Sequence, residues 1–180
     1  MAIAVANRYA RALADVIQSQ QGDYRQVLGE LEDFARAYRQ SLELREVFDT
    51  PALPLEEKLK VLEAIATRLT ISPVTLNFLR VLATHYRMAM LPEMCRAFHR
   101  ISNERLGVVE VRITSAGELM EAEQQALRAR FAELTGKAVE FDFHLDQALV
   151  GGLVAQIGST VYDGSVRGQL ERIRQQLAGG

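Results

Sequence analysis

The sequence has 180 residues, of which 48% are hydrophobic and 24% charged, and its formal net charge is -2. This length suits one domain or two small ones, since domains cluster at about 100–150 residues. Basic residues are scattered along the chain, so the concentrated positive charge of a nucleic-acid-binding protein is missing and we expect no nucleic-acid partner. No apolar run approaches the roughly 20 residues that cross a bilayer. We therefore expect a soluble chain that reaches a membrane only through another protein.

Motifs for catalysis or for cofactor binding are missing from the sequence. The single cysteine, Cys95, excludes an internal disulfide framework, and its neighbours Met94 and Phe98 predict a small core residue rather than a reactive thiol. The three histidines lie in separate segments without metal-ligand spacing, so we expect no metal site. Neither phosphate-binding fingerprint, GxxxxGK[ST] or GxGxxG, occurs, and there is no GxSxG nucleophile motif. These observations predict a protein without a cofactor and give no support to an enzyme.

The first hundred residues have the apolar spacing of consecutive short helices. Turn, cap and proline signals separate them. The predicted boundaries are Gly22-Asp23 between the first two helices, Ser41 before the third, Thr50-Pro51 after it, Pro54 and Ser72-Pro73 opening the fourth and fifth, and Pro92 and Gly107 bounding the sixth. The second helix is predicted to carry its apolar stripe from Val27 to Leu42.

After Gly107 the apolar period changes from 3.6 to 2. "VVEVRITS" and "AVEFDFHL" alternate as half-buried strands, and the segment between them predicts a helix with Leu119, Ala126, Leu127, Phe131 and Leu134 facing inward. The fold class is therefore mainly α with a smaller α/β part: an N-terminal six-helix bundle followed by a small C-terminal α/β domain with a short mixed sheet. We place the domains at 1–106 and 107–180.

The stretch "ALVGGLVAQIGSTVYDGSVRGQL" predicts a β-hairpin that leads into a closing helix over 166–177. Its glycines fall at turns and strand ends, where they serve backbone geometry. The alternative, an anion held by the amides at the start of the closing helix, stays open. The residues with predicted turn and packing roles are Gly151, Gly152, Gly158, Asp163, Gly164 and Ser165.

Two helices carry more apolar surface than their own core requires. In the first, polar residues occupy one narrow arc and leave an apolar arc of roughly 200°, whereas a surface helix needs little more than 100°. The excess lies along Val5, Ala12 and Val16, and the fifth helix repeats the anomaly. Either both helices are central and buried all round, or a groove between them accepts a partner helix.

Three segments carry a resemblance to a known family. "ANRYARAL", "NFLRVLATHYRMAMLPE" and "DQALVGGLVAQIGSTVYDGSVRGQLERI" closely resemble the delta subunit of bacterial F-type ATP synthase, a relative of the mitochondrial oligomycin-sensitivity-conferring protein. The resemblance spans the whole chain. It implies a noncatalytic stator subunit that links the N-terminal helices of the alpha subunits to the C-terminal ends of the peripheral-stalk b subunits, so that proton-driven rotation is coupled to ATP synthesis.

The resemblance also implies a binding site and a location. Ala12 and Val81 correspond to the family's groove for the alpha-subunit helix, and Val5, Val16 and Asn77 are added from helical adjacency. The implied location is the cytoplasmic face of the bacterial inner membrane, as a peripheral protein held there by the complex. Two alternatives stay open: a scaffold of another membrane complex, and a small anion- or nucleotide-binding enzyme domain.

Overall fold

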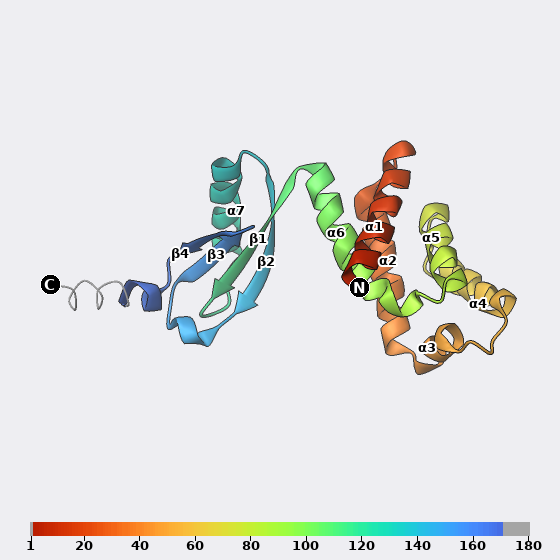
Figure 1. Cartoon of the computed structure of the whole chain (residues 1–180). Helices are drawn as coiled ribbons and strands as arrows, with labels where there is room; N and C mark the ends of the chain where they lie inside the picture. The colour runs from red at the N-terminus through yellow and green to blue at the C-terminus, as the bar shows by residue number, and fades with distance from the viewer. Residues whose placement is uncertain (1, 171–180) are drawn as a thin grey trace. The chain divides into compact units, whose positions relative to one another are not determined.

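A computed structural model describes residues 2–170 of the chain (Figure 1). It is mostly helical, with one small four-stranded sheet. The chain divides into two compact units, Met1–Ser102 and Asn103–Gly180. This division lies slightly before the boundary expected from the sequence, after residue 106.

The first unit is built from helices whose ends follow the sequence signals. The Asp23 side chain accepts hydrogen bonds from the backbone amides of Arg25 and Gln26, and Ser41 caps the third helix through the amide of Leu44. Leu42 does not extend the second helix as its apolar spacing suggested, because extended backbone at Ser41 ends that helix, and Leu42 is 58% exposed. The elements are α1 (Ala2–Ser19), α2 (Tyr24–Gln40), α3 (Leu42–Asp49), α4 (Leu55–Arg68), α5 (Pro73–Thr84), the 3-10 turn η1 (Met88–Met90) and α6 (Leu91–Leu106).

The core of the helical unit combines small and large side chains. On α1 the residues Ala6, Ala10 and Ala14 are buried, and Leu13 and Ile17 lie beside them. Small side chains allow the helix to approach its neighbours closely, while the large ones fill the space between helices. The remaining core side chains come from the other helices and include Phe34, Leu62, Leu79, Leu82, Met94, Cys95 and Phe98.

A charged side chain also lies in this core, and the sequence did not reveal it. Lys58 of α4 is fully buried, and its Nζ donates a hydrogen bond of 3.1 Å to the carbonyl oxygen of Phe48. The same ammonium lies 4.6 Å from the ring centroid of Tyr86. A buried cation is tolerated only where such partners replace water. Lys58 therefore joins α4 to the end of α3 and to the turn after α5.

The second unit contains the sheet, with α7 against one face (Figure 1). Its strand order is β2-β1-β3-β4; β1 and β2 are parallel, and the other pairs are antiparallel. Parallel β1 and β2 require a crossover, which α7 provides. The elements are β1 (Val108–Ser115), α7 (Glu121–Thr135), β2 (Ala138–Leu145), the 3-10 turn η2 (Gln147–Leu149), β3 (Leu153–Ile157) and β4 (Thr160–Asp163).

The core of the second unit is small and lies between α7 and the sheet. Val111, Ile113 and Ala155 are buried from the sheet side, and Phe131 covers them from α7. Leu134, predicted to face inward, is 59% exposed, and Ala126 is exposed as well. The prediction was wrong at these two positions because a narrow four-stranded sheet covers only a narrow stripe of the helix.

The glycine-rich stretch brings two backbone segments into direct contact. Gly152 has φ +75°, and a Cβ there would collide with the carbonyl oxygen of Gly164. A Cβ at Gly151 would lie 3.1 Å from the Val166 side chain. Gly158, at φ +56°, forms the tight turn between β3 and β4. In this stretch glycine is required for a close approach at Gly152 and for a left-handed turn at Gly158.

Gly152→Ala should destabilise the second unit by roughly 2–5 kcal/mol, because the left-handed backbone and the collision with Gly164 both oppose a side chain. Circular dichroism and urea denaturation of the full chain measure this loss. Gly117→Ala is the matched control, since its Cβ would meet open space. Equal stability of the two variants would contradict the packing role of Gly152.

Candidate functional site

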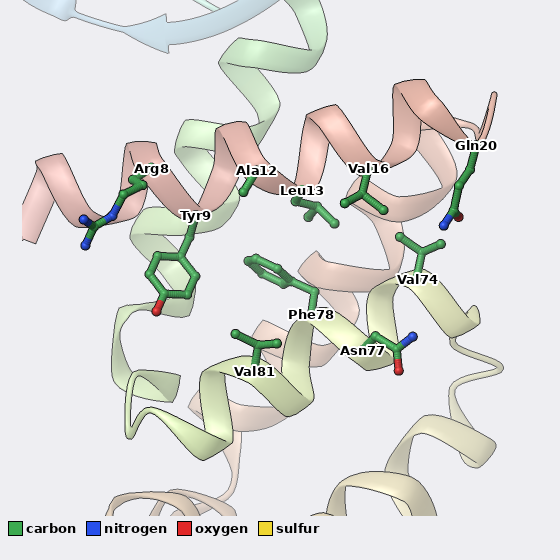
Figure 2. A pocket seen from close by; sticks show the side chains of 10 residues that line it. All are labelled: Arg8, Tyr9, Ala12, Leu13, Val16, Gln20, Val74, Asn77, Phe78 and Val81. Atoms are coloured by element: carbon green, nitrogen blue, oxygen red, sulfur yellow. The ribbon is translucent and has the colours of Figure 1, made fainter.

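An apolar groove of about 470 Å³ runs between α1 and α5 (Figure 2). Its lining positions recur every three or four residues on each helix, so each helix contributes one continuous face. The groove is lined by Arg8, Tyr9, Ala12, Leu13, Val16 and Gln20 from α1 and the residue after it, and by Val74, Asn77, Phe78 and Val81 from α5.

The groove has a packed floor and an exposed apolar rim. Leu13 is 4% exposed, and the rings of Tyr9 and Phe78 meet edge to face with their centroids 6.5 Å apart. On the rim, Val16 is 42% exposed and Val81 is 45% exposed. Neither helix is therefore buried all round, and the excess apolar surface seen in the sequence faces this groove.

One end of α5 is tied to α1 through Arg87 and Tyr9. The Nη1 of Arg87 donates a hydrogen bond of 2.8 Å to the Tyr9 hydroxyl, and the guanidinium lies 5.1 Å from the centre of the Tyr9 ring. Arg87 is half-buried and follows the last turn of α5. This contact fixes the Tyr9 ring in the floor of the groove.

The other end of α5 is tied to α2 through Glu30. Its Oε2 accepts hydrogen bonds from the hydroxyls of Ser72 (2.6 Å) and Thr75 (2.5 Å), and its Oε1 accepts one from Gln26 (2.8 Å). Burial alone would raise the pKa of Glu30, but these hydrogen bonds and one from the Ser72 backbone outweigh it and lower the pKa below its ordinary value. Ser72 opens α5 as predicted, although its hydroxyl binds Glu30 and does not cap the helix's own amides.

The structure brings most of the predicted partner-binding residues together. Ala12, Val16, Asn77 and Val81 all line the groove, and the Asn77 Oδ1 accepts a hydrogen bond of 3.1 Å from Arg80. Val5 is not among the lining residues and is partly buried. Tyr9, Phe78, Arg87 and Glu30 shape the groove but were not predicted as site residues. Their contacts join positions far apart in the sequence, where helical periodicity carries no information.

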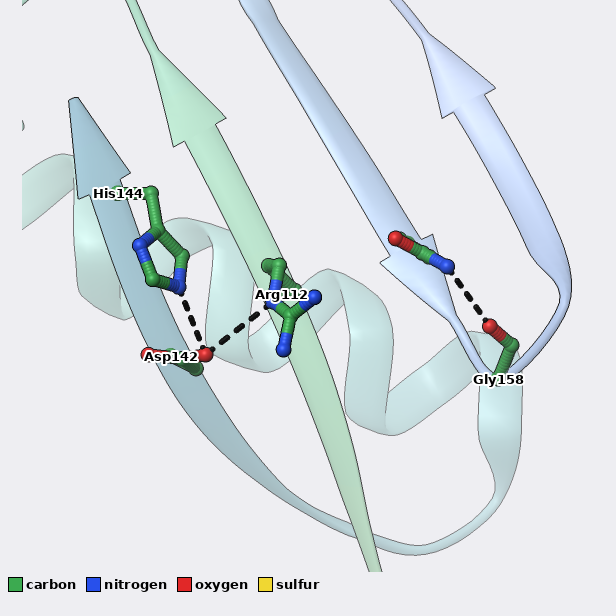
Figure 3. A network of polar contacts seen from close by, with 5 residues as sticks. Arg112, Asp142, His144 and Gly158 are labelled. Carbon is green, nitrogen blue, oxygen red and sulfur yellow. Dashed lines mark hydrogen bonds and ion pairs between the residues drawn. The ribbon is translucent and has the colours of Figure 1, made fainter. Parts of the chain in front are cut away.

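A polar network lies on the sheet face opposite α7 (Figure 3). The Asp142 Oδ2 is 2.8 Å from the His144 Nε2 and 3.3 Å from the Arg112 Nε. The hydrogen bond with His144 lowers the pKa of Asp142 most, and Arg112 lowers it further. On the same sheet, the side-chain amide of Gln156 donates a hydrogen bond of 3.0 Å to the backbone carbonyl of Gly158. Asp142 thus pairs with His144 and Arg112, and Gln156 bonds the backbone; this is the arrangement of a solvated sheet face.

The start of the closing helix makes its hydrogen bonds within the protein. The amide of Ser165 donates to the Asp163 carboxylate (2.8 Å), the amide of Val166 to the carbonyl of Gly151 (2.9 Å), and the amide of Gly168 to the Ser165 hydroxyl (3.0 Å). A bound anion would have to displace these partners and approach the negative charge of Asp163. The geometry therefore gives Asp163, Gly164 and Ser165 a turn-and-cap arrangement. The predicted remainder of this helix, 171–177, lies outside the described residues.

Within residues 2–170 no group of three or more histidine, cysteine or carboxylate side chains is placed to hold a metal ion. Over the same part of the chain, no helix has both the length and the apolarity to cross a membrane.

Comparison with known proteins places this architecture in a family. The sequence profile of the "ATP synthase delta (OSCP) subunit" family matches residues 5–177. The chain belongs to the ATP synthase delta (OSCP) family. This family is the noncatalytic delta (OSCP) subunit of F-type ATP synthase, a component of the peripheral stalk. The resemblance seen in the sequence is confirmed over nearly the whole chain.

Relatives in the delta family match along their full length. The chain is 44% identical to ATP synthase subunit delta of Acidobacterium capsulatum over 175 residues, 97% of this chain and 98% of that protein. It is 33% identical to the Koribacter versatilis subunit over 171 residues, 95% and 96% of the two chains. Among solved structures, a chain of the Toxoplasma gondii mitochondrial ATP synthase hexamer is similar with a TM-score of 0.71 and 25% identity, covering 96% of this chain and 97% of that one.

Glu30→Gln should destabilise the helical unit by about 1–2 kcal/mol at pH 7, because an amide is a weaker acceptor for the two hydroxyls of α5. The folded-state pKa of Glu30 is lowered, so its contribution is present above the unfolded value, near 4.5, and is lost as pH falls through the folded value. The difference in stability between wild type and variant should therefore shrink below about pH 4.5. Urea denaturation at several pH values measures it.

Glu32→Gln is the control for this measurement, because Glu32 is an exposed glutamate of the same helix. A stability difference between wild type and Glu30→Gln that does not change with pH would contradict the role of the Glu30 carboxylate.

Proposed function

We propose that this subunit is the connector between the catalytic head and the peripheral stalk. In this proposal α1 to α6 form a six-helix bundle whose α1/α5 groove binds the N-terminal helix of an alpha subunit. The second unit binds the C-terminal ends of the b subunits. Membrane association is then indirect, through the complex, at the cytoplasmic face of the bacterial inner membrane.

The observation that carries the proposal is the groove itself. A helix laid between α1 and α5 would cover the exposed faces of Val16 and Val81 and contact the rings of Tyr9 and Phe78. Helix-in-groove recognition uses such an apolar trough between two fixed helices. Membership of a peripheral-stalk family makes a subunit of the same complex the expected guest.

The second unit supports the proposal less directly. It is a compact unit of its own, and several of its apolar side chains are exposed, including Leu145 at 61% and Val150 at 74%. Exposed apolar side chains such as these would be covered if the unit binds a partner. A scaffold of another membrane complex would use the same surfaces, and the family match favours the ATP synthase.

Ala12→Asp should leave the helical unit folded, because Ala12 is exposed on the groove wall. It should weaken binding of an alpha-subunit N-terminal peptide by roughly 2–4 kcal/mol, since the guest would bury an unpaired carboxylate. A melting curve and a calorimetric titration with the peptide measure the two effects.

Ala64→Asp is the matched control, because Ala64 is an exposed alanine of α4 that does not line the groove. It should bind the peptide as wild type does. Unchanged affinity in Ala12→Asp would place the alpha-subunit site elsewhere, and a lost melting transition would show that Ala12 belongs to the core.

Gly152→Ala should separate the two attachments. The substitution destabilises only the second unit, so the variant should bind the alpha-subunit peptide with wild-type affinity. Its affinity for the b subunits should fall at least about tenfold, because only a fraction of the molecules would then have a folded second unit. Surface plasmon resonance with immobilised b subunit measures the second value. Retained b binding with a disrupted second unit would contradict the assignment of the stalk site to that unit.

A further inference from the structure

The α1/α5 groove carries a charged side chain at one of its two ends. Arg8 is the single ionic side chain among the ten residues that line it, and Figure 2 shows Arg8 at one end and Gln20 at the other. The two residues are twelve positions apart on α1 and its continuation, which corresponds to about 18 Å of helix. A guest helix of roughly three turns therefore meets a cation at one end of the groove and neutral amides, Gln20 and Asn77, towards the other.

The arginines near the groove differ in their partners. Arg87 donates to the Tyr9 hydroxyl, and Arg80 is held 2.6 Å from the Glu63 carboxylate. Both guanidinium groups therefore already have partners within the protein. Arg8 is exposed, and no carboxylate lines the groove with it. Its guanidinium is consequently available to a group brought by the guest.

We propose that the guest helix presents an aspartate or glutamate to Arg8, and that this ion pair sets the direction in which the helix lies. The proposal rests on the groove being the alpha-subunit site. Apolar burial along Ala12, Val16 and Val81 supplies affinity but is nondirectional, so a helix could lie in either sense. A guest that covers Arg8 without a carboxylate would desolvate the guanidinium and provide no compensating ion pair or hydrogen bond. The sense that pairs the charges is therefore favoured.

The test is a double-mutant cycle between Arg8 and the carboxylates of the partner peptide. The probe is a 25-residue peptide with the N-terminal sequence of the alpha subunit from the same organism, and a set in which each acidic residue is changed to its amide. Arg8→Gln should weaken binding of the unmodified peptide about three- to tenfold at low salt, the range of an ion pair that is partly desolvated. One amide-substituted peptide should lose the same factor against wild type and no further factor against Arg8→Gln.

Arg11→Gln is the matched control, because Arg11 is an exposed arginine of α1 that does not line the groove. It should change the affinity less than twofold. A spin label on the peptide end that carries the coupled carboxylate should broaden amide signals near Arg8 more strongly than those near Gln20.

Two results overturn the proposal in distinguishable ways. If Arg8→Gln binds the peptide as wild type does while Ala12→Asp does not, the groove is the alpha-subunit site but Arg8 does not orient the helix. If the peptide does not bind the wild-type chain, the groove assignment fails and the orientation proposal fails with it.

Discussion

The placement of α5 against α1 is the constraint on which the helical unit depends. Arg87 and Tyr9 tie the segment after α5 to α1, and Glu30 ties the start of α5 to α2. Because both ends of α5 are held by contacts within the protein, the groove wall that α5 forms is fixed without a guest. A preformed wall reduces the ordering that binding would otherwise require. The same contacts explain how Val16 and Val81 stay exposed in a folded protein.

A different constraint governs the second unit, where backbone meets backbone. Gly152 and Gly164 approach each other too closely for any side chain at Gly152, and the amides of Gly164 and Val166 donate to carbonyls of the segment 151–153. A phosphate-binding loop keeps its amides directed at the ligand. In this protein the amides of Gly164 and Val166 instead donate to carbonyls of the same unit. The glycine-rich stretch that opened the question of a ligand site is thus a structural joint between β3 and the closing helix.

Sequence reasoning succeeded where the signal was local. The change of period near residue 107, the Gly158 turn and the proline or cap signals at the starts of α2 to α6 all depend on neighbouring residues, and the structure has helices and strands at those places. The apolar arc of the first helix marked Ala12 and Val16, the family resemblance pointed to Ala12 and Val81, and helical adjacency added Asn77; all four line the groove. Val5 lies on the same apolar arc of α1 but does not line the groove. The arc gives the direction in which a side chain points, but it does not show how much of α1 lies beside α5.

The residues that sequence reasoning missed share a physical reason. Lys58 has the sequence context of a surface lysine on an amphipathic helix, and the Phe48 carbonyl and the Tyr86 ring make its burial tolerable. Tyr9 and Arg87 are separated by almost eighty positions, so no window along the chain contains both. Leu134 was wrongly predicted to face inward, because the breadth of the sheet that would have to cover it depends on four strands together. Pairings of this kind are decided by topology.

A stator subunit needs attachments that persist while the rotor turns, and the groove has the physical character for that role. Affinity differences among related protein complexes reside mainly in the rate of dissociation, which rises when buried apolar anchors are removed. Tyr9, Leu13 and Phe78 form an apolar floor that could provide such anchors, and Arg87 holds the Tyr9 ring in place. Polar groups stand only at the ends and on the rim, where water competes for them and their contribution to affinity is small. In the proposed complex the apolar floor would therefore hold the guest helix, and the charge at one end would determine its direction.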